Sequence, residues 1–277
     1  MLVGLFVGKR ESRPWVVSDE LWSLIEPLRP IPAPKVVQGR PRVPDRKALC
    51  GILFVLHTGI QWEYLPQELG FGSGMTCWRR LAAWNEAGVW DRLHLVLLTR
   101  LRAAKQIDWS RAVIDSPRPG RPQGPKSGPS PVDRARPGSK HHVLVDGHGI
   151  PLAVSLTGGN RNDITQLIPL LEKVPAVAGL VGRPRRRPDT LYADRGYDHD
   201  KYRRLVWERG IKPVIARRGV AHGSGLGVHR WVVERTIAWL HGFRRLRIRW
   251  ERRDDIHEAF LGLATCLITL RHVQRLC

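Results

Sequence analysis

The 277-residue sequence has few cysteines and no long apolar run, and each absence excludes a class of protein. Its four cysteines lie far apart without a CxxC pair, so we expect buried free thiols, not a zinc site or a disulfide framework. The longest apolar stretch, AFLGLATCLITL (259–270), is shorter than the roughly 18 residues of a membrane-spanning helix and predicts a buried helix. The first residues, MLVGLFVGKRES, place basic residues after apolar ones, the reverse of a signal peptide. These absences predict a cytoplasmic protein without a membrane partner.

Acidic residues are also scarce. The chain has 46 lysines and arginines against 25 acids, a formal net charge of +21. Such a surface is typical of proteins that bind a polyanion, most often nucleic acid. Apolar residues make up 42% of the chain, which is enough for a folded core.

Residues 15–106 are predicted to be helical, after a flexible N-terminus at 1–14. Ser18 can cap a helix through residue 28, Asp45 can cap the next, and Thr76 can cap a third that ends at Gly88. Because the third helix follows a glycine-rich turn and carries Arg79 and Arg80, it suggests a helix-turn-helix that binds DNA. An ordinary helical hairpin with exposed arginines fits equally well, since the turn is longer than usual.

The segment GRPR (39–42) precedes this region. Its Arg40 and Arg42 could lie extended in an AT-rich minor groove, and the segment could equally be a basic linker.

Residues 107–277 have a different pattern, in which short apolar strands alternate with helices. A loop rich in proline and glycine at 116–140 follows the first strand, and Asp146-Gly147 is typical of a hairpin turn. The alternation predicts an α/β sheet. The predicted order is a strand at 111–115, a hairpin at 141–157, a helix at 164–174, a strand at 190–193, a helix at 199–210, a strand at 212–216 and a helix at 231–247.

Three acids occupy positions in this order of elements that suggest a site. Asp115 and Asp194 each follow an apolar strand, where ligands gather in α/β sheets, and Glu234 lies on a helix four residues after Arg230. Carboxylates that converge repel each other, and a divalent cation such as Mg²⁺ relieves this repulsion. Taken singly, each acid is commonly a turn, a cap or an ion-pair partner. Five other aspartates compete for the same role: Asp133, Asp146, Asp163, Asp198 and Asp200.

Four stretches together carry a resemblance: AVIDS (112–116), PGSKHHVLVDGHGIPLAVSLTGGNRND (137–163), LYADRGYDHDKYRRL (191–205) and HRWVVERTIAWLHGFRRLRIRWERR (229–253). With them, the chain resembles the DDE transposases of bacterial insertion sequences, in their IS-five-like branch, over roughly residues 15–272. The resemblance implies an RNase H-like catalytic domain with a mixed sheet, preceded by a small all-helical DNA-binding region. It implies Asp115, Asp194 and Glu234 as the catalytic residues that hold Mg²⁺, with Mn²⁺ as a substitute.

The resemblance also implies the reaction and the partners. The protein is expected to bind the terminal inverted repeats of its element, cleave the DNA ends and join the 3′-hydroxyl to target DNA, as a homo-oligomer on paired ends. The expected phosphate contacts are Arg230, Arg244, Arg245 and Arg247. Two rival functions are a metal-dependent nuclease without strand transfer and an inactive copy that only binds DNA.

Some residues depart from the family pattern or have a simpler interpretation. Gly227 and His241 replace a tyrosine and a lysine around Glu234. The stretch SPRPGRPQGP (116–125) after Asp115 is rich in proline, so the first strand is expected to end at Asp115. Four further residues are expected to be structural: Trp231 and Trp239 in the core, and His141 and His142 on a strand.

Overall fold

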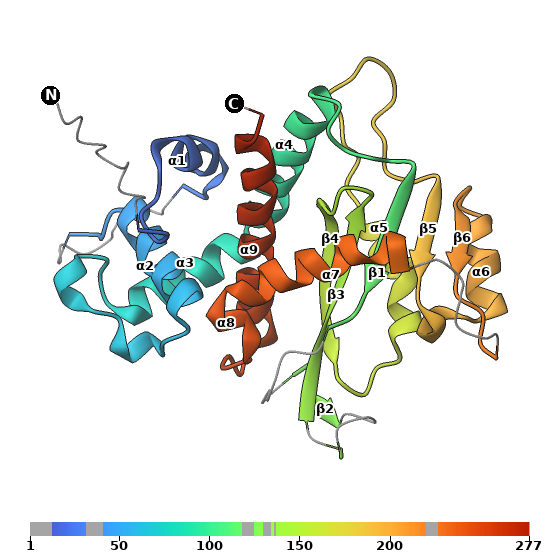
Figure 1. Ribbon diagram of the computed structural model, residues 1–277. Helices are drawn as coiled ribbons and strands as arrows, with labels where there is room; N and C mark the ends of the chain where they lie inside the picture. The colour runs from blue at the N-terminus through green and yellow to red at the C-terminus, as the bar shows by residue number, and fades with distance from the viewer. Residues whose placement is uncertain are drawn as a thin grey trace, which may run out of the picture.

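The computed structural model describes residues 13–31, 41–117, 125–129, 134–135, 137–219 and 227–276 (Figure 1). The elements described before residue 107 are all helical, as predicted for residues 15–106. Ser18 caps the first helix by accepting a hydrogen bond from the backbone N–H of Leu21, and Gly59 ends the second with a φ of 77°. The α-helices are α1 (Asp19–Ile25), α2 (Asp45–Thr58), α3 (Gly74–Glu86) and α4 (Val89–Ala103), with 3₁₀ turns η1 (Glu26–Leu28), η2 (Trp62–Tyr64) and η3 (Gln67–Leu69).

Two of the predicted N-caps were wrong. Helix α3 begins at Gly74, and the hydroxyl of Ser73 caps it by accepting from the backbone N–H of Thr76. Asp45 is the first residue of α2 and makes no cap, because its carboxylate binds arginines instead. An ion pair with a guanidinium is stronger than a hydrogen bond to a neutral N–H, which explains the difference.

Gly74 has a packing role that a substitution tests. A Cβ at this position would lie 1.8 Å from the carbonyl oxygen of Trp62, a backbone atom that no rotamer change can move. We expect Gly74→Ala to lower the free energy of unfolding by about 3 kcal/mol. Gly242→Ala is the matched control, since a Cβ at that position would meet nothing within 4 Å, and it should leave stability within about 0.5 kcal/mol. Urea titration followed by circular dichroism measures both, and equal midpoints would contradict the role of Gly74.

The second part of the chain forms a mixed sheet, as the alternating pattern predicts. Strand β3 lies antiparallel between β1 and β4, while β5 is parallel to β1 and β6 is parallel to β5. This order and these directions are those of an RNase H-like sheet. The strands are β1 (Arg111–Asp115), β2 (Gly128–Pro129), β3 (Pro137–Asp146), β4 (Pro151–Gly158), β5 (Thr190–Ala193) and β6 (Lys212–Ile215).

Helices cover the sheet. Helix α7 crosses it and packs on β1, β3 and β5, whereas α5 packs on β3 and β4, and α6 on β6 (Figure 1). The hairpin between β3 and β4 turns at Asp146-Gly147, as predicted. The helical elements are η4 (Asp163–Gln166), α5 (Leu167–Lys173), η5 (Arg195–Tyr197), α6 (Asp200–Trp207), α7 (Gly227–Gly242), α8 (Arg244–Arg247) and α9 (Asp254–Gln274).

Helix α9 joins the two parts of the chain. It lies between the N-terminal helices and the sheet, and it packs on α3, α4 and β4 (Figure 1). Trp62 stacks on Phe260 of α9, with ring centroids 5.6 Å apart, and the indole N–H of Trp62 donates to Glu251. One apolar core therefore extends from the N-terminal helices into the sheet.

Candidate active site

The two aspartates predicted at strand ends lie on neighbouring parallel strands. Asp115 is the last residue of β1, and Asp194 directly follows β5. The strands pair with Val113 opposite Tyr192. If this register continues by two residues, Asp115 comes opposite Asp194. Parallel pairing thus brings together carboxylates that lie far apart in the sequence.

Glu234 reaches the same region from α7. Its side chain is exposed, and one turn earlier Arg230 places Nη2 3.4 Å from Oδ2 of Asp115. Burial raises the pKa of Asp115, and the nearby charges of Asp194 and Glu234 raise it further. The hydrogen bond from the backbone N–H of Ser116 and the charge of Arg230 oppose this rise. Asp194 and Glu234 are therefore each close enough to Asp115 to affect its ionisation.

The backbone after Asp194 explains the motif LYADRGYD. Oδ1 of Asp194 accepts a hydrogen bond from the N–H of Gly196 at 2.9 Å and so caps the 3₁₀ turn η5. A Cβ at position 196 would lie 3.0 Å from that same oxygen. Glycine therefore leaves room for the carboxylate, and the turn fixes one of its oxygens.

A chain of hydrogen bonds, partly or fully buried, connects the residues that follow the two aspartates, and sequence reasoning missed it. The hydroxyl of Ser116 contacts Nδ1 of His142 at 2.6 Å and the hydroxyl of Tyr197 at 2.7 Å. Nε2 of His142 contacts the hydroxyl of Thr157 at 2.7 Å. Burial lowers the pKa of His142 to about 4, so its ring is neutral at pH 7, with one donor and one acceptor nitrogen. The chain links the loops that carry Asp115 and Asp194. Its only sequence signals were the pair HH (141–142) and the Tyr of RGY.

The competing aspartates that the structure describes have other partners. Asp146 accepts N–H bonds within the hairpin turn, and its burial raises its pKa to about 6. Asp163 pairs with Lys140, Asp198 with Arg203, and Asp200 with Arg217. Asn162, not Asp163, caps the 3₁₀ turn η4. Asp133 lies outside the described residues.

Most of the arginines predicted to contact DNA have exposed side chains where the structure describes them. Arg79, Arg244 and Arg247 are exposed, and Arg42 is exposed beside Asp45. Arg40 lies outside the described residues.

The positions of Arg80 and Arg245 do not fit the prediction that their side chains contact DNA phosphates at the surface. Nε of Arg80 lies 2.9 Å from Oδ1 of Asp45. Arg245 is 3% exposed and donates to Glu251 and to the backbone of Ile60. Both guanidiniums hold parts of the protein together, and to bind DNA they would have to leave buried partners.

Trp231 was wrongly expected in the core. It is 50% exposed on α7, while Trp239 is partly buried against the core. His141 and His142 lie on β3, as predicted.

The prolines after Asp115 are compatible with the sheet as far as the structure describes them. Strand β1 ends at Asp115, as expected, and the carbonyl of Pro117 still accepts a hydrogen bond from the N–H of His141 at 2.9 Å. Since proline lacks only the donor, this contact is preserved. The remaining segment 118–124 lies outside the described residues.

Two kinds of feature are absent from the part of the chain that the structure describes. No group of three or more His, Cys, Asp or Glu side chains there is arranged to hold a metal ion, and no helix there is long and apolar enough to cross a membrane.

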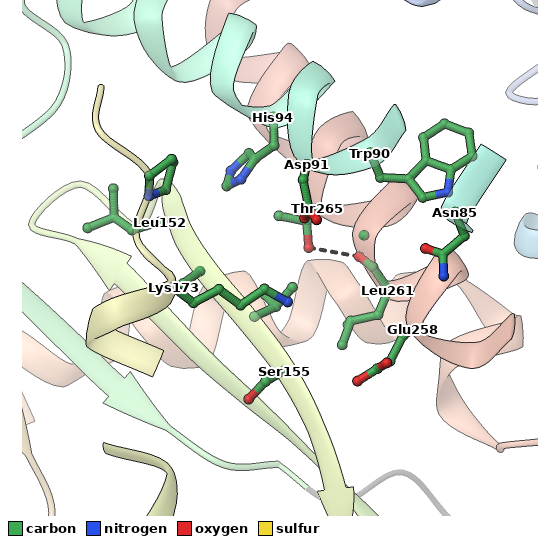
Figure 2. A pocket seen from close by; sticks show the side chains of 14 residues that line it. Asn85, Trp90, Asp91, His94, Leu152, Ser155, Lys173, Glu258, Leu261 and Thr265 are labelled. Carbon is green, nitrogen blue, oxygen red and sulfur yellow. Dashed lines mark hydrogen bonds between the residues drawn. The ribbon is translucent and has the colours of Figure 1, made fainter. Parts of the chain in front are cut away.

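A cavity of about 390 Å³ lies elsewhere, where the N-terminal helices, β4 and α9 meet (Figure 2). Four polar side chains point into it, Asp91 and His94 from α4, Lys173 from α5 and Glu258 from α9 (Figure 2). His94 already contacts the carbonyl of Pro151, and Glu258 pairs with Lys126. The three candidate carboxylates do not line this cavity.

Comparisons with known proteins cover most of the chain. A family model described as Transposase DDE domain matches residues 107–269, and one described as a transposase of the IS4/5 family (DUF4096) matches residues 17–94. A protein of Burkholderia cepacia described as a transposase for insertion sequence element IS402 is 61% identical over 165 residues, which cover 60% of this chain and 77% of the relative.

Three further similarities are weaker or shorter. A second protein of Burkholderia cepacia, the uncharacterized 16.2 kDa protein of insertion element IS402, is 60% identical over 103 residues, 36% of this chain and 70% of its own. The transposase for insertion sequence element IS1106 of Neisseria meningitidis serogroup B is 27% identical over 150 residues, 50% of this chain and 48% of its own. The structure of the Mos1 transposase paired-end complex with left transposon end covers 83% of this chain and 82% of its own, but its TM-score of 0.24 at 14% identity is too low to compare folds.

Proposed function

Since the chain belongs to the DDE-domain transposases of the IS4/5 family, we propose that it binds the terminal inverted repeats of its insertion sequence, cleaves the DNA ends and joins the freed 3′-hydroxyl to target DNA. We propose Asp115, Asp194 and Glu234 as its catalytic residues. The observation that carries this proposal is the parallel pairing of β1 and β5, whose register leads Asp115 toward Asp194. The effect of Glu234 on the pKa of Asp115 supports its place in the same site.

The residues fit a divalent cation in their chemistry. All three offer hard oxygen ligands, and the pKa of Asp115 is raised by burial and by the other two carboxylates, a repulsion that a cation would relieve. We propose that they would hold Mg²⁺, with Mn²⁺ as a substitute. When bound, the ion would supply charge neutralisation and an activated water for phosphodiester hydrolysis.

The other proposed roles belong to the protein's own side chains. Arg230 lies beside Asp115 and would orient this carboxylate or contact the DNA next to it. The exposed Arg244 and Arg247 follow α7 directly and would contact phosphates near the cut. The helical region at 15–106 would recognise the terminal repeats, with the exposed Arg79 as one contact, through a helix-turn-helix or another helical arrangement. Because two ends must be joined, we propose that the protein works as a homo-oligomer.

The test is a strand-transfer assay. A labelled duplex of the terminal repeat is incubated with the protein, a supercoiled plasmid and Mg²⁺. Joined product supports the transposase. Nicking without joining would favour a nuclease, and binding without any metal-dependent cut would indicate an inactive copy.

Tyr197 provides a test of the hydrogen-bonded chain behind the site. Tyr197→Phe removes the 2.7 Å contact with the hydroxyl of Ser116 but keeps the ring. We expect stability to fall by about 1 kcal/mol and joined product to form about tenfold more slowly, with an unchanged Kd for the repeat duplex. Tyr64→Phe, at an exposed tyrosine, is the control and should change neither quantity. A normal rate in Tyr197→Phe would mean that this contact is only structural.

A further inference from the structure

One face of α7 carries a stack of aromatic and basic side chains that the candidate active site does not use. The guanidinium of Arg235 lies between two indoles, 4.5 Å from the ring centroid of Trp231 and 4.8 Å from that of Trp239. These residues are four apart, so they follow one side of the helix. Trp231 is 50% exposed and Val228, one turn earlier, is 72% exposed. An indole held in place by an arginine and open to solvent is a surface for stacking.

A basic pocket adjoins this stack. It has a volume of about 290 Å³, and its polar lining comes from Arg235, Arg275, His272, His148 and Gln106. No acidic side chain is among the described residues that line it. Nη2 of Arg235 donates to the carbonyl of His148, whereas its Nε is buried and has no hydrogen-bond partner among the described residues. The pocket lies between α7 and the last turns of α9, since it is lined by Arg235 and Arg275, and the ring centroids of His272 and Trp239 are 5.6 Å apart.

The charges on either side of α7 are of opposite sign. Arg235 follows Glu234 directly, and successive residues on a helix point about 100° apart. The acidic residue therefore faces the candidate active site while the next residue faces the basic pocket. A strand of nucleic acid that passes over α7 could contact both.

We propose that this face of α7 and the adjoining pocket bind single-stranded DNA next to the cleaved end, with a phosphate in the pocket beside Arg235 and Arg275 and an unpaired base stacked on Trp231. Charge complementarity supports a phosphate, because the pocket has two guanidiniums and no acidic lining among the described residues. The exposed indole supports an unpaired base, because stacking on an aromatic ring accepts any base. The inference rests on the proposed function, since it takes the substrate to be DNA with a cut end.

The test measures binding without a divalent ion. Fluorescence anisotropy in EDTA compares a blunt terminal-repeat duplex with the same duplex carrying a short unpaired 3′ extension. We expect Trp231→Ala to weaken binding of the extended duplex about tenfold and to leave the blunt duplex unchanged, while Trp231→Phe retains most of the affinity. Arg275→Gln should instead lower the slope of log affinity against log salt by about 0.7 for the extended duplex.

Matched controls lie on α6. Trp207 is 56% exposed and Arg204 is exposed, so Trp207→Ala and Arg204→Gln remove the same kinds of side chain elsewhere. The inference is overturned if Trp231→Ala binds both duplexes like wild type, or if the controls weaken binding as much. It is also overturned if Trp231→Ala changes only self-association in sedimentation, which would mark the face as a contact between copies. A failure of the proposed function would differ, since the extended duplex would still bind but no metal-dependent product would form.

Discussion

Asp194→Ala is expected to abolish both cleavage and joining, with product formation lowered on the order of a thousandfold or more, while the Kd for the repeat duplex stays within about twofold. Asp194 directly follows β5, and its Oδ1 accepts a hydrogen bond from the N–H of Gly196. The substitution therefore removes a negative charge from the site, while no apolar side chain of the core is lost. The strand-transfer assay with Mg²⁺ measures the products, and anisotropy in EDTA measures the binding. Asp115→Ala should give the same result, since the register leads Asp115 toward Asp194.

The control for this pair is Asp200→Ala. Asp200 lies on the exposed first turn of α6, where its carboxylate pairs with Arg217. The substitution removes the same group from the same part of the chain and should leave the rate within about twofold. Wild-type product from Asp194→Ala would remove this residue from the site. A loss of rate with a matching loss of binding would assign it to DNA recognition.

Stability is expected to fall steeply as the pH drops below 6.5. Burial lowers the pKa of five histidines well below the ordinary 6.5, to about 3 for His257 and about 4 for His57, His94, His142 and His272. Between these values and pH 6.5, the unfolded chain binds protons that the folded chain does not. The full stability is therefore present above pH 6.5 and is lost as the pH falls towards 4. His94 alone contributes a loss on the order of 3 kcal/mol by pH 4.

Urea titrations at pH 7.5, 6.0 and 5.0 measure this loss as a falling midpoint at constant slope. His94→Gln tests one member of the set, because an amide can still donate to the carbonyl of Pro151 but does not titrate. We expect this variant to lose less stability than wild type between pH 7.5 and 5.0. His199→Gln, at a partly exposed histidine, should follow wild type. A midpoint independent of pH would show that the buried histidines do not govern stability in this range.

The elements could be predicted because their signals are local. Helical spacing and the cap at Ser18 depend on neighbouring residues, and the structure confirms them. The Asp146-Gly147 turn and the alternation of strands and helices are confirmed for the same reason. The N-caps at Thr76 and Asp45 failed where a neighbour competed, since Ser73 lies one turn earlier and arginines from outside the helix bind Asp45.

Whether a given arginine in a basic run is exposed or buried could not be predicted from the sequence. Arg244 and Arg245 are adjacent and chemically identical, yet the first is exposed and the second is buried against Glu251. Position on a short helix decides which one faces the core, and the partner of Arg245 lies beyond the end of that helix. Trp231 shows the reverse case, because an aromatic residue in an apolar helix lies half exposed on its outer face.

The sequence by itself determined the family motifs, the order of strands and helices, and the three acids to consider. Only the tertiary structure decided the parallel register that leads Asp115 toward Asp194, the hydrogen bonds from Ser116 to His142 and Tyr197, and the pocket beside α7. The physical reason is the sequence separation of the interacting residues. Helix propensity and capping depend on residues a few positions apart. The contacts that form the site join residues far apart in the chain, which only the folded backbone brings within bonding distance.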